Sequence, residues 1–434
     1  MQGIALPPLE KRLKARYLML VQAHMHSVSK LAAGVASLPS LCSAFAATQA
    51  AWRFLNNVRV TLSALIEPLR AVGRDRLAAS EAPFALLVHD WSKLSFSYAD
   101  SKRDLARLTH ATDVGYELTT ALLVSGDDGK PLAPMEMHLK TADGVLSTRG
   151  RAPKDLPHSD QVLPTMKAAR AWGLSRPLVH VIDREADSVD HYRRWDAAGH
   201  RFLVRGDDRR VIWEEQGRLL SEIRAELNTR RAFHPVQPVS YHDTTAQLWV
   251  AETSVTLHRP AKKSVKGRKF ERAGRPLRLR FVVVQLRDDE GRVVAEWMLL
   301  SNVPEGWATA TKLAFCYYWR WRIESYFKLL KGHGQQLEQW QQETGPAIAR
   351  RLLVASMACL VVWQLQAEDS PEAAELRDTL IRLSGRQTKR KRPHTAPALL
   401  AGLWVLVSML ALLKHCDLDH LKTLAARIPY LDTA

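Results

Sequence analysis

The chain has 434 residues, of which 46% are hydrophobic and 25% are charged, and this composition excludes wholesale disorder and suits two to four folded domains. Lysine and arginine number 62 against 45 aspartates and glutamates, so the formal net charge is +17. An excess of this size favours a polyanionic partner, with nucleic acid as the first candidate and an anionic membrane surface as the second.

The first 75 residues are predicted to be helical and basic, with a break at Ser37, Pro39 and Ser40. This pattern is compatible with a helical N-terminal DNA-binding region at residues 1–75. A plain helical cap without a DNA contact fits the same pattern. The N-terminus has no apolar core of the kind that a signal peptide needs.

From Pro83 onward, short apolar runs alternate with helical patterns, which is typical of an α/β fold with buried strands. Two of these runs, FALLVHD and PLVHVID, end on an aspartate, at Asp90 and Asp183. Further strands are predicted over 93–98, 116–124 and 201–206, and a helix over 186–196. Together they indicate an α/β domain over about residues 76–370.

A strand-rich insertion is predicted inside this domain, over about residues 207–302. Its strand-like segments are 248–257, 277–287 and 293–301, and a basic, glycine-containing loop covers 260–275.

The remainder of the chain is predicted to be helical. One long helix begins near Thr309 and ends at Gly332, and another covers about 346–366. A helical C-terminal region follows over 371–434, with an exposed basic run at 386–392.

The uncharged apolar run from Ala396 to Leu413 barely reaches the length of a membrane span. It favours a buried helix or an oligomer interface, and so a dimerisation role for this region. The four cysteines are far apart and lack metal-ligand spacing, so a zinc ribbon or a disulfide framework is not expected. We expect a cytoplasmic protein.

The two strand-terminal aspartates are the first candidates for chemistry. Carboxylates delivered by rigid buried strands can share divalent metal ions, and a two-metal site clamps the attacking and leaving oxygens of a phosphodiester. Mg²⁺ suits such a site because it prefers hard oxygen ligands. The alternative is that each aspartate simply ends a strand. The segment DREAD that begins at Asp183 also fits a salt-bridged turn in which Asp187 helps to start the next helix.

A polar stripe marks the predicted long helix. Tyr317, Arg320, Glu324 and Lys331 have offsets of 0, 3, 7 and 14, so on an ideal helix they fall within a sector of roughly 60°. A carboxylate flanked by cations and a phenol suits a metal ligand beside a phosphate backbone. An ordinary solvated face with helical ion pairs is the alternative.

The spacing Y-x2-R-x3-E-x6-K resembles the signature of the YREK group of bacterial insertion-sequence DDE transposases, insertion-sequence family four. LLVHDWSKLSFSY and VIDREAD resemble the first- and second-aspartate motifs of that family, and EWMLLSNVP resembles the last strand of its inserted domain. AAWRFLNN is similar to its N-terminal DNA-binding region. The resemblance covers about residues 45–365.

The resemblance implies a ribonuclease H-like catalytic core with a β-rich insertion between the second aspartate and the glutamate. It implies that Asp90, Asp183 and Glu324 bind two Mg²⁺ ions, with Mn²⁺ as a substitute. It also implies DNA contacts from Tyr317, Arg320, Lys331 and Trp297, the last by stacking on a flipped base. Without the resemblance, Trp297 would be interpreted as a core tryptophan.

The function implied by the resemblance is cut-and-paste transposition, in which a homodimer pairs the element ends, cleaves them through a hairpin intermediate and joins them to target DNA. The implied setting is the bacterial cytoplasm, at the nucleoid. Two other hypotheses stay open on the sequence: a non-catalytic DNA-binding relative or transposition inhibitor, and a membrane-associated basic protein.

Overall fold

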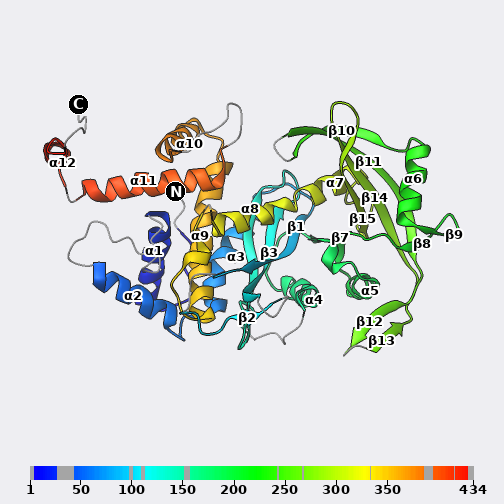
Figure 1. Cartoon of the computed structure of the whole chain (residues 1–434), viewed down its shortest axis with the longest axis horizontal. Coiled ribbons are helices and arrows are strands. Elements are labelled where there is room, and N and C mark those ends of the chain that lie inside the picture. Colours follow the sequence, from blue (N-terminus) through cyan, green and yellow to red (C-terminus); the bar gives the residue numbers. More distant parts are fainter. Residues whose placement is uncertain are drawn as a thin grey trace.

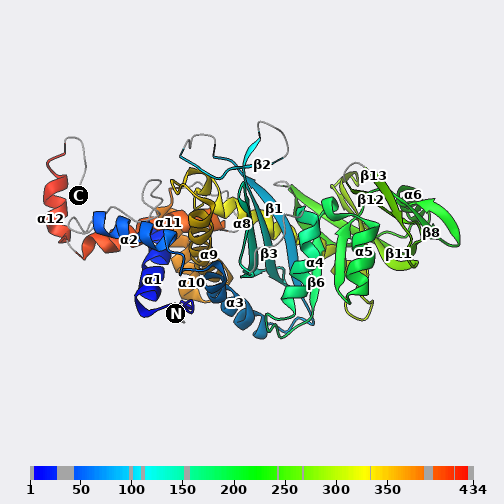
Figure 2. The same ribbon diagram turned by 90° about the horizontal axis from the view of Figure 1, so that it is seen from below.

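The computed structural model describes residues 4–26, 44–96, 101–108, 113–150, 157–241, 244–265, 268–332, 334–385, 394–414 and 416–428. The molecule is elongated, with helices gathered toward one end and a strand-rich body at the other (Figures 1 and 2). The predicted break at Ser37, Pro39 and Ser40 and the basic run 386–392 lie outside the described residues.

One large sheet runs through the strand-rich half of the described chain. Its main path has the order β5-β4-β3-β1-β6-β7-β15-β14-β11-β8-β9, while β2 pairs with β3 and β10 with β11. The strands that come before the predicted insertion are β1 (Ala85–Leu94), β2 (Ala106–Arg107), β3 (Val114–Ser125), β4 (Pro131–Thr141), β5 (Gly144–Ser147), β6 (Leu178–Ile182) and β7 (Arg201–Arg205). The protein therefore has the mixed α/β fold that its apolar runs predict.

The centre of the sheet is parallel and its flanks are antiparallel. Strand β6 pairs in parallel with β1 on one side and β7 on the other, while β3 pairs antiparallel with β1. Helices α4 (His158–Ala169) and α5 (Val189–Ala197) lie in the connections before β6 and before β7, and the short 3-10 helix η1 (Arg184–Ala186) follows β6. Crossover helices of this kind let neighbouring strands run parallel.

The segment predicted as an insertion contains all of the remaining strands, and all of these except β12 and β13 continue the same sheet through the pairing of β15 with β7. These elements are β8 (Arg210–Trp213), β9 (Gln216–Leu219), α6 (Leu220–Thr229), β10 (His234–Tyr241), β11 (Thr244–Leu257), β12 (Ala261–Val265), β13 (Arg268–Arg272), β14 (Leu277–Arg287) and β15 (Val293–Ser301). The predicted basic loop 260–275 was wrong, because its two halves pair as the separate antiparallel hairpin β12–β13.

The helical end of the molecule is built from both termini around a central apolar helix, α9. Its helices are α1 (Lys11–His26), α2 (Ala44–Asn56), α3 (Leu62–Ala78), α9 (Gly345–Ala367), α10 (Pro371–Leu383), α11 (Ala396–Leu413) and α12 (Leu418–Ala425), with the 3-10 turn η2 at Leu337–Gln339. Helices α7 (Ala310–Tyr318) and α8 (Trp321–Leu330) connect the two ends, since α7 packs against β7, β11 and β14 and α8 against β1 and α9. Packing of α1, α2 and α3 against α9 joins the N-terminal segment to the rest of the core.

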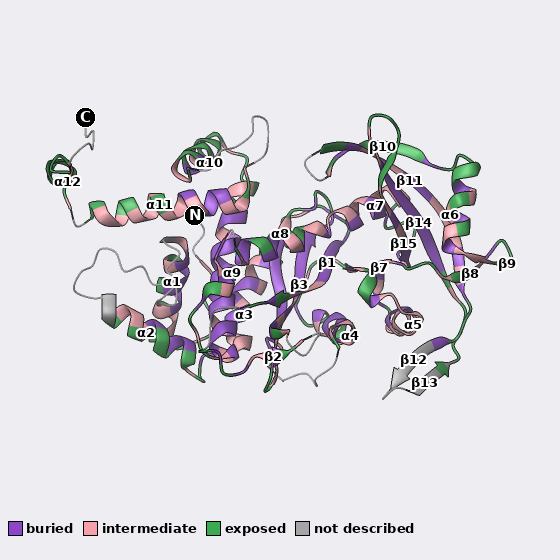
Figure 3. Ribbon diagram, viewed as in Figure 1, coloured by how far each residue is buried: buried purple, intermediate pink, exposed green. Residues whose placement is uncertain are grey.

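Two helices are long and apolar enough to cross a membrane by length and composition, α9 and α11. In α9, 83% of the most apolar window is buried inside the protein, but in α11 only 22% is buried. Figure 3 shows this contrast, since α9 is largely buried and much of α11 is partly or fully exposed. Helix α9 is therefore a core helix, whereas α11 keeps an uncovered apolar surface.

Candidate active site: three carboxylates around one guanidinium

Asp90 and Asp183 meet where the parallel pairing of β1 and β6 ends. The last paired residues are His89 and Ile182, so each aspartate is the next residue along its own strand direction. Asp90 is not at the end of β1, contrary to the sequence prediction, because antiparallel pairing with β3 carries the strand on to Leu94. The parallel register nevertheless places both aspartates at the same edge of the sheet.

Glu324 comes to this edge on α8. The predicted single helix from Thr309 to Gly332 was wrong, because it is divided into α7 and α8 at Trp319 and Arg320. At the division the backbone bonds tighten to three-residue spacing, with Arg322 N donating to Trp319 O at 2.9 Å. The chain keeps a helical course, so the polar stripe still faces the sheet edge.

Arg320 lies between the three carboxylates. Its guanidinium donates to Asp90 at 3.1 Å and to Glu324 at 2.9 Å, and it lies 3.7 Å from an oxygen of Asp183. The residue is only 5% exposed. The structure therefore brings the three predicted carboxylates together, and one predicted DNA-contacting residue is the group that links them.

Tyr317 and Trp297 form the wall behind Asp183. The Tyr317 hydroxyl donates to Asp183 at 3.0 Å, and its ring lies 5.5 Å from that of Trp297, centroid to centroid. Tyr317 is 1% exposed and Trp297 is 5% exposed. In this conformation both side chains are packed within the protein, so stacking of Trp297 on a base would require its ring to be uncovered.

Lys331 lies at the far end of the stripe, just after α8. Its ammonium group donates to the carbonyl of Lys93, at the end of β1, and lies 3.4 Å from a Glu338 carboxylate oxygen. Its side chain is 25% exposed. Of the four predicted DNA-contacting side chains, Lys331 is the most accessible.

The aspartates have different environments although they share one cation. Burial raises the pKa of Asp90 to about 6, with Glu324 and Asp183 adding repulsion that Arg320 and the Trp91 amide partly offset. Burial alone would also raise the pKa of Asp183. Contacts with Arg320, the Arg184 amide and the Tyr317 hydroxyl outweigh it and lower the pKa of Asp183 below its ordinary value.

The donor set of the cluster fits a divalent metal, since Asp90, Asp183 and Glu324 supply hard oxygen ligands from three converging elements. In the conformation described, no three histidine, cysteine, aspartate or glutamate side chains of the described residues form a group arranged to hold a metal ion. One oxygen of each carboxylate instead lies 2.9–3.7 Å from the Arg320 guanidinium, and the other oxygens of the two aspartates accept hydrogen bonds from neighbouring groups. Metal binding at these residues would therefore require Arg320 to move.

A second polar cluster borders the first and was missed in the sequence. The Trp91 ring stacks on His158 with 4.0 Å between centroids, and its indole N–H donates to Glu185 at 2.8 Å. His158 lies 3.2 Å from Glu185 and 3.3 Å from Glu117. This cluster ties the residues that follow Asp90 and Asp183 to α4 and β3. Only the charge density of DREAD pointed toward it.

Three neutral histidines lie beneath the site, His89 on β1, His180 on β6 and His200 directly before β7. His89 Nε2 and His180 Nδ1 are 3.0 Å apart, and the His180 ring meets that of His200 edge-on at 5.5 Å. Burial lowers the pKa of His89 to about 3 and of His200 to about 4, and holds that of His180 well below its usual value. The floor of the cluster is therefore uncharged at neutral pH.

The DREAD segment is a salt-bridged turn. Arg184 lies 3.3 Å from Asp207, and the Asp187 carboxylate accepts from Arg209 and from the Tyr192 hydroxyl. Asp187 does not cap the next helix, contrary to the alternative weighed for it, because Ser188 occupies the N-cap position of α5. The turn thereby ties the segment after β6 to the residues between β7 and β8.

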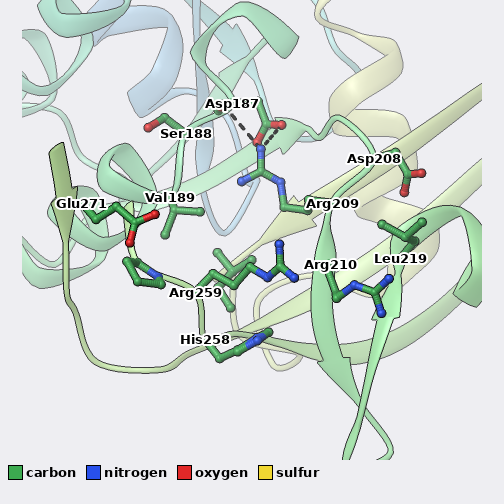
Figure 4. A pocket seen from close by; sticks show the side chains of 12 residues that line it. Asp187, Ser188, Val189, Asp208, Arg209, Arg210, Leu219, His258, Arg259 and Glu271 are labelled. Atoms are coloured by element: carbon green, nitrogen blue, oxygen red, sulfur yellow. Dashed lines mark hydrogen bonds and ion pairs between the residues drawn. The ribbon is translucent and has the colours of Figure 1, made fainter. Parts of the chain in front are cut away.

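A cavity of about 650 Å³ opens beside this turn (Figure 4). Its charged lining is mixed. Arg209 pairs with Asp187, Arg210 donates to the Gly217 carbonyl, and Asp208 accepts from Ser221. Because acids and bases line it together, and Arg209 is paired with Asp187, the cavity does not by itself define a site for one ligand class.

The family model of the transposase DDE domain matches residues 136–361, which is more than half of the chain. The chain therefore belongs to this family, and membership implies an enzyme of the transposase class. The matched range includes Asp183 and Glu324 and begins after Asp90. No curated protein sequence matches the chain.

Among solved structures, the chain is similar to the cryo-EM structure of the piggyBac transposase synaptic complex with hairpin DNA. The TM-score is 0.36 and the identity 11%, over 98% of this chain and 74% of that one. A likeness at this level supports no argument about fold or function.

Proposed function

We propose that the chain is a cut-and-paste transposase of the YREK group, with Asp90, Asp183 and Glu324 as its metal ligands. The observation that carries this proposal is that three carboxylates from β1, the turn after β6, and α8 converge on Arg320. Buried like charges repel each other, so such a cluster costs stability and needs a function to explain it.

We also propose that the catalytic core is ribonuclease H-like. Its support is the strand order, in which β4, β3 and β1 are antiparallel neighbours and β6 and β7 follow in parallel. Two acidic residues at one edge of this parallel pair, joined by a third from a later helix, complete the arrangement. Strands β8 to β15 lie within the proposed insertion, about 207–302.

The proposed cofactor is a pair of Mg²⁺ ions, for which Mn²⁺ can substitute. When bound, they would polarise the scissile phosphate. Asp90 and Asp183 are held by paired strands, and Tyr317 and the Arg184 amide orient the carboxylate of Asp183. Glu324 is on a helix whose N-terminal turn is tightened at Arg320, so it is the ligand most easily repositioned.

The substrate is proposed to be the double-stranded DNA of the element ends, followed by target DNA. Water attacks one strand and releases a 3′-hydroxyl, which attacks the opposite strand to give a hairpin. A second water opens the hairpin, and the same carboxylates serve strand transfer. Tyr317, Arg320, Lys331 and Trp297 contact the DNA in this proposal. All except Lys331 must first become more accessible than their present exposed fractions of 5% or less.

The remaining assignments follow from the same proposal. Residues 1–75 form a DNA-binding region, and residues 371–434 join two copies in a homodimer through the exposed apolar surface of α11. The protein acts in the bacterial cytoplasm, at the nucleoid. The charge of +17 supports a DNA partner.

A cleavage assay on DNA bearing the element ends, with and without Mg²⁺, tests the function. Asp90→Ala and Glu324→Ala should abolish nicking while DNA binding is kept. Glu375→Gln is the matched control, since it removes one carboxylate from an exposed position on α10. Nicking by the Asp90 or Glu324 variant at the rate of the unsubstituted protein would refute the assignment.

A non-catalytic DNA-binding relative is the second candidate, and the occupation of the carboxylate cluster by Arg320 favours it. Such a protein would bind element ends without metal and would nick them under no condition. The same assay separates the two candidates.

A further inference from the structure

The Arg320 guanidinium occupies the centre of the carboxylate cluster, in the position that a bound cation would take. Two of its nitrogens contact three carboxylates, at 3.1, 2.9 and 3.7 Å. The guanidinium also lies 5.7 Å from the Tyr317 ring and 5.4 Å from the Trp321 ring, measured from its central carbon to each ring centroid. Its remaining nitrogen, Nε, is buried and has no hydrogen-bond partner among the described residues.

The positive charge of Arg320 offsets the mutual repulsion of the three carboxylates. The side chains of Asp90, Asp183 and Glu324 are 16%, 33% and 31% exposed, so solvent screens their mutual repulsion only in part. One guanidinium leaves the cluster with a net charge of about −2, if all three acids are ionised. The cluster is then still attractive to a divalent cation.

The carboxylate oxygens that contact Arg320 cannot at the same time bind a divalent metal ion. A divalent ion needs oxygen ligands at about 2 Å, and the oxygens that face the centre of this cluster are those bound to Arg320. A unit positive charge that stays a few Å away also repels an incoming cation. Arg320 and a metal ion must therefore compete.

We infer that Arg320 is the resident counter-cation of the active site, which holds the three carboxylates together before metal enters and competes with the metal for their oxygens. The inference rests on the proposed function, because it takes these carboxylates to be the metal ligands. Arg320 acts through the carboxylates and is in this respect a positioning residue.

The displaced side chain has a defined second use. Arg320 shares the helix stripe with Tyr317 and Lys331, and a freed guanidinium on this stripe is a bidentate phosphate ligand. Metal loading and phosphate binding would then favour each other, since each removes the same side chain from the carboxylates. The catalytic form would thus be most populated when both cofactor and DNA are present.

Mn²⁺ binding to the full chain, followed by electron paramagnetic resonance of free Mn²⁺ in the absence of DNA, tests this inference. Arg320→Ala should lower the Mn²⁺ dissociation constant by about tenfold or more, because it removes the competing cation. Arg320→Lys keeps the charge but cannot span three carboxylates, so its Mn²⁺ dissociation constant should lie between those of Arg320→Ala and the unsubstituted protein. Arg322→Ala is the matched control. Arg322 lies two residues further along the same helix, and its side chain donates to the Gly129 carbonyl, so this change removes the same charge outside the carboxylate cluster.

A thermal unfolding experiment guards against a folding defect. Without metal, Arg320→Ala should unfold at a lower temperature than the unsubstituted protein, and Mn²⁺ should raise its midpoint by more than it raises that of the unsubstituted protein. If Arg320→Ala does not fold, the Lys variant still decides, through a lowered dissociation constant for Mn²⁺.

The outcomes separate the inference from the function. Weaker or unchanged Mn²⁺ binding in the Arg320 variants, with binding in the unsubstituted protein that Glu324→Ala abolishes, overturns the inference and leaves the proposed function standing. Mn²⁺ binding that Asp90→Ala and Glu324→Ala do not alter overturns the proposed metal site, and the inference with it. Tighter binding in Arg320→Ala but not in Arg322→Ala supports both.

Discussion

The carboxylate cluster and helix α11 both depart from the usual partition of side chains, in opposite directions. The cluster removes charge from water: Arg320 is 5% exposed and the Asp90 side chain 16%. Helix α11 leaves apolar groups in water, and Val405, Met409 and Leu410 are 38%, 48% and 53% exposed. Both arrangements cost free energy in the isolated chain.

The difference lies in where the compensation comes from. Arg320 compensates the carboxylates inside one chain, so the cluster is stable without a partner, and we infer that a metal ion has to compete with Arg320 for its oxygens. Along its outer half, α11 has no apolar cover within the described residues, and we propose that a second copy of the chain supplies it. For the carboxylate cluster we therefore predict that metal replaces Arg320 at the carboxylates, and for α11 we predict association of two chains.

The largest expected effect comes from breaking the cluster. Glu324→Gln keeps the side-chain shape and removes the charge, so DNA cleavage should fall by on the order of a thousandfold, while gel-shift binding of element ends stays close to that of the unsubstituted protein. Retained cleavage would show that the cluster is structural only.

The second prediction breaks α11. Changing Met409 and Leu410 together to Glu places two charges on the exposed apolar surface, so the dimer dissociation constant should rise by about a hundredfold in sedimentation equilibrium. The thermal midpoint should change little. Leu353→Glu on α9, where the residue is 1% exposed, is the contrasting control and should prevent folding. A dimer unaffected by the double change would exclude α11 as the interface.

The third prediction concerns acid. Burial lowers the pKa of His24 and of His89 to about 3, so these imidazoles are neutral in the folded state and protonate near pH 6.5 when unfolded. The unfolded chain then binds more protons between pH 6.5 and 3, and stability is lost as pH falls through that window.

At pH 5 the loss should be about 2 kcal/mol for each of these histidines. Denaturant unfolding at pH 7 and pH 5 measures it, and His89→Gln should reduce the pH dependence. A stability that does not change between these pH values would contradict the buried neutral state. The described part of α11 contains no histidine, so its association should not share this dependence.

The smallest effect is expected for Tyr317→Phe. Loss of the hydroxyl removes one contact that lowers the pKa of Asp183, so that pKa, followed by carboxyl-carbon NMR of the metal-free protein, should rise by a few tenths of a pH unit. The acid limb of the cleavage profile should stay in place, because Asp90 has the higher pKa, about 6, and sets it. Cleavage at neutral pH should fall only severalfold, and an unchanged pKa of Asp183 would show that the hydroxyl does not tune it.

Much of the local structure could be predicted from the sequence because local patterns decide it. Alternating or continuous apolar residues predict strands β11, β14 and β15 and helix α9 within a few residues of their observed bounds. The basic hairpin β12–β13 and the division of the long helix at Arg320 were missed. Neither changes the hydrophobic pattern, and each depends on hydrogen bonds that the pattern does not encode.

The sequence by itself determined which residues could act together: two aspartates after apolar strands, and a glutamate on a stripe with Tyr317, Arg320 and Lys331. Only the tertiary structure decided that Arg320, 230 residues from Asp90, lies between the carboxylates rather than facing outward. It also decided that Trp297 is buried, and that α9 and α11, so similar in composition, have opposite surroundings. Spacing determines the face of a helix, but what covers that face depends on contacts between distant segments.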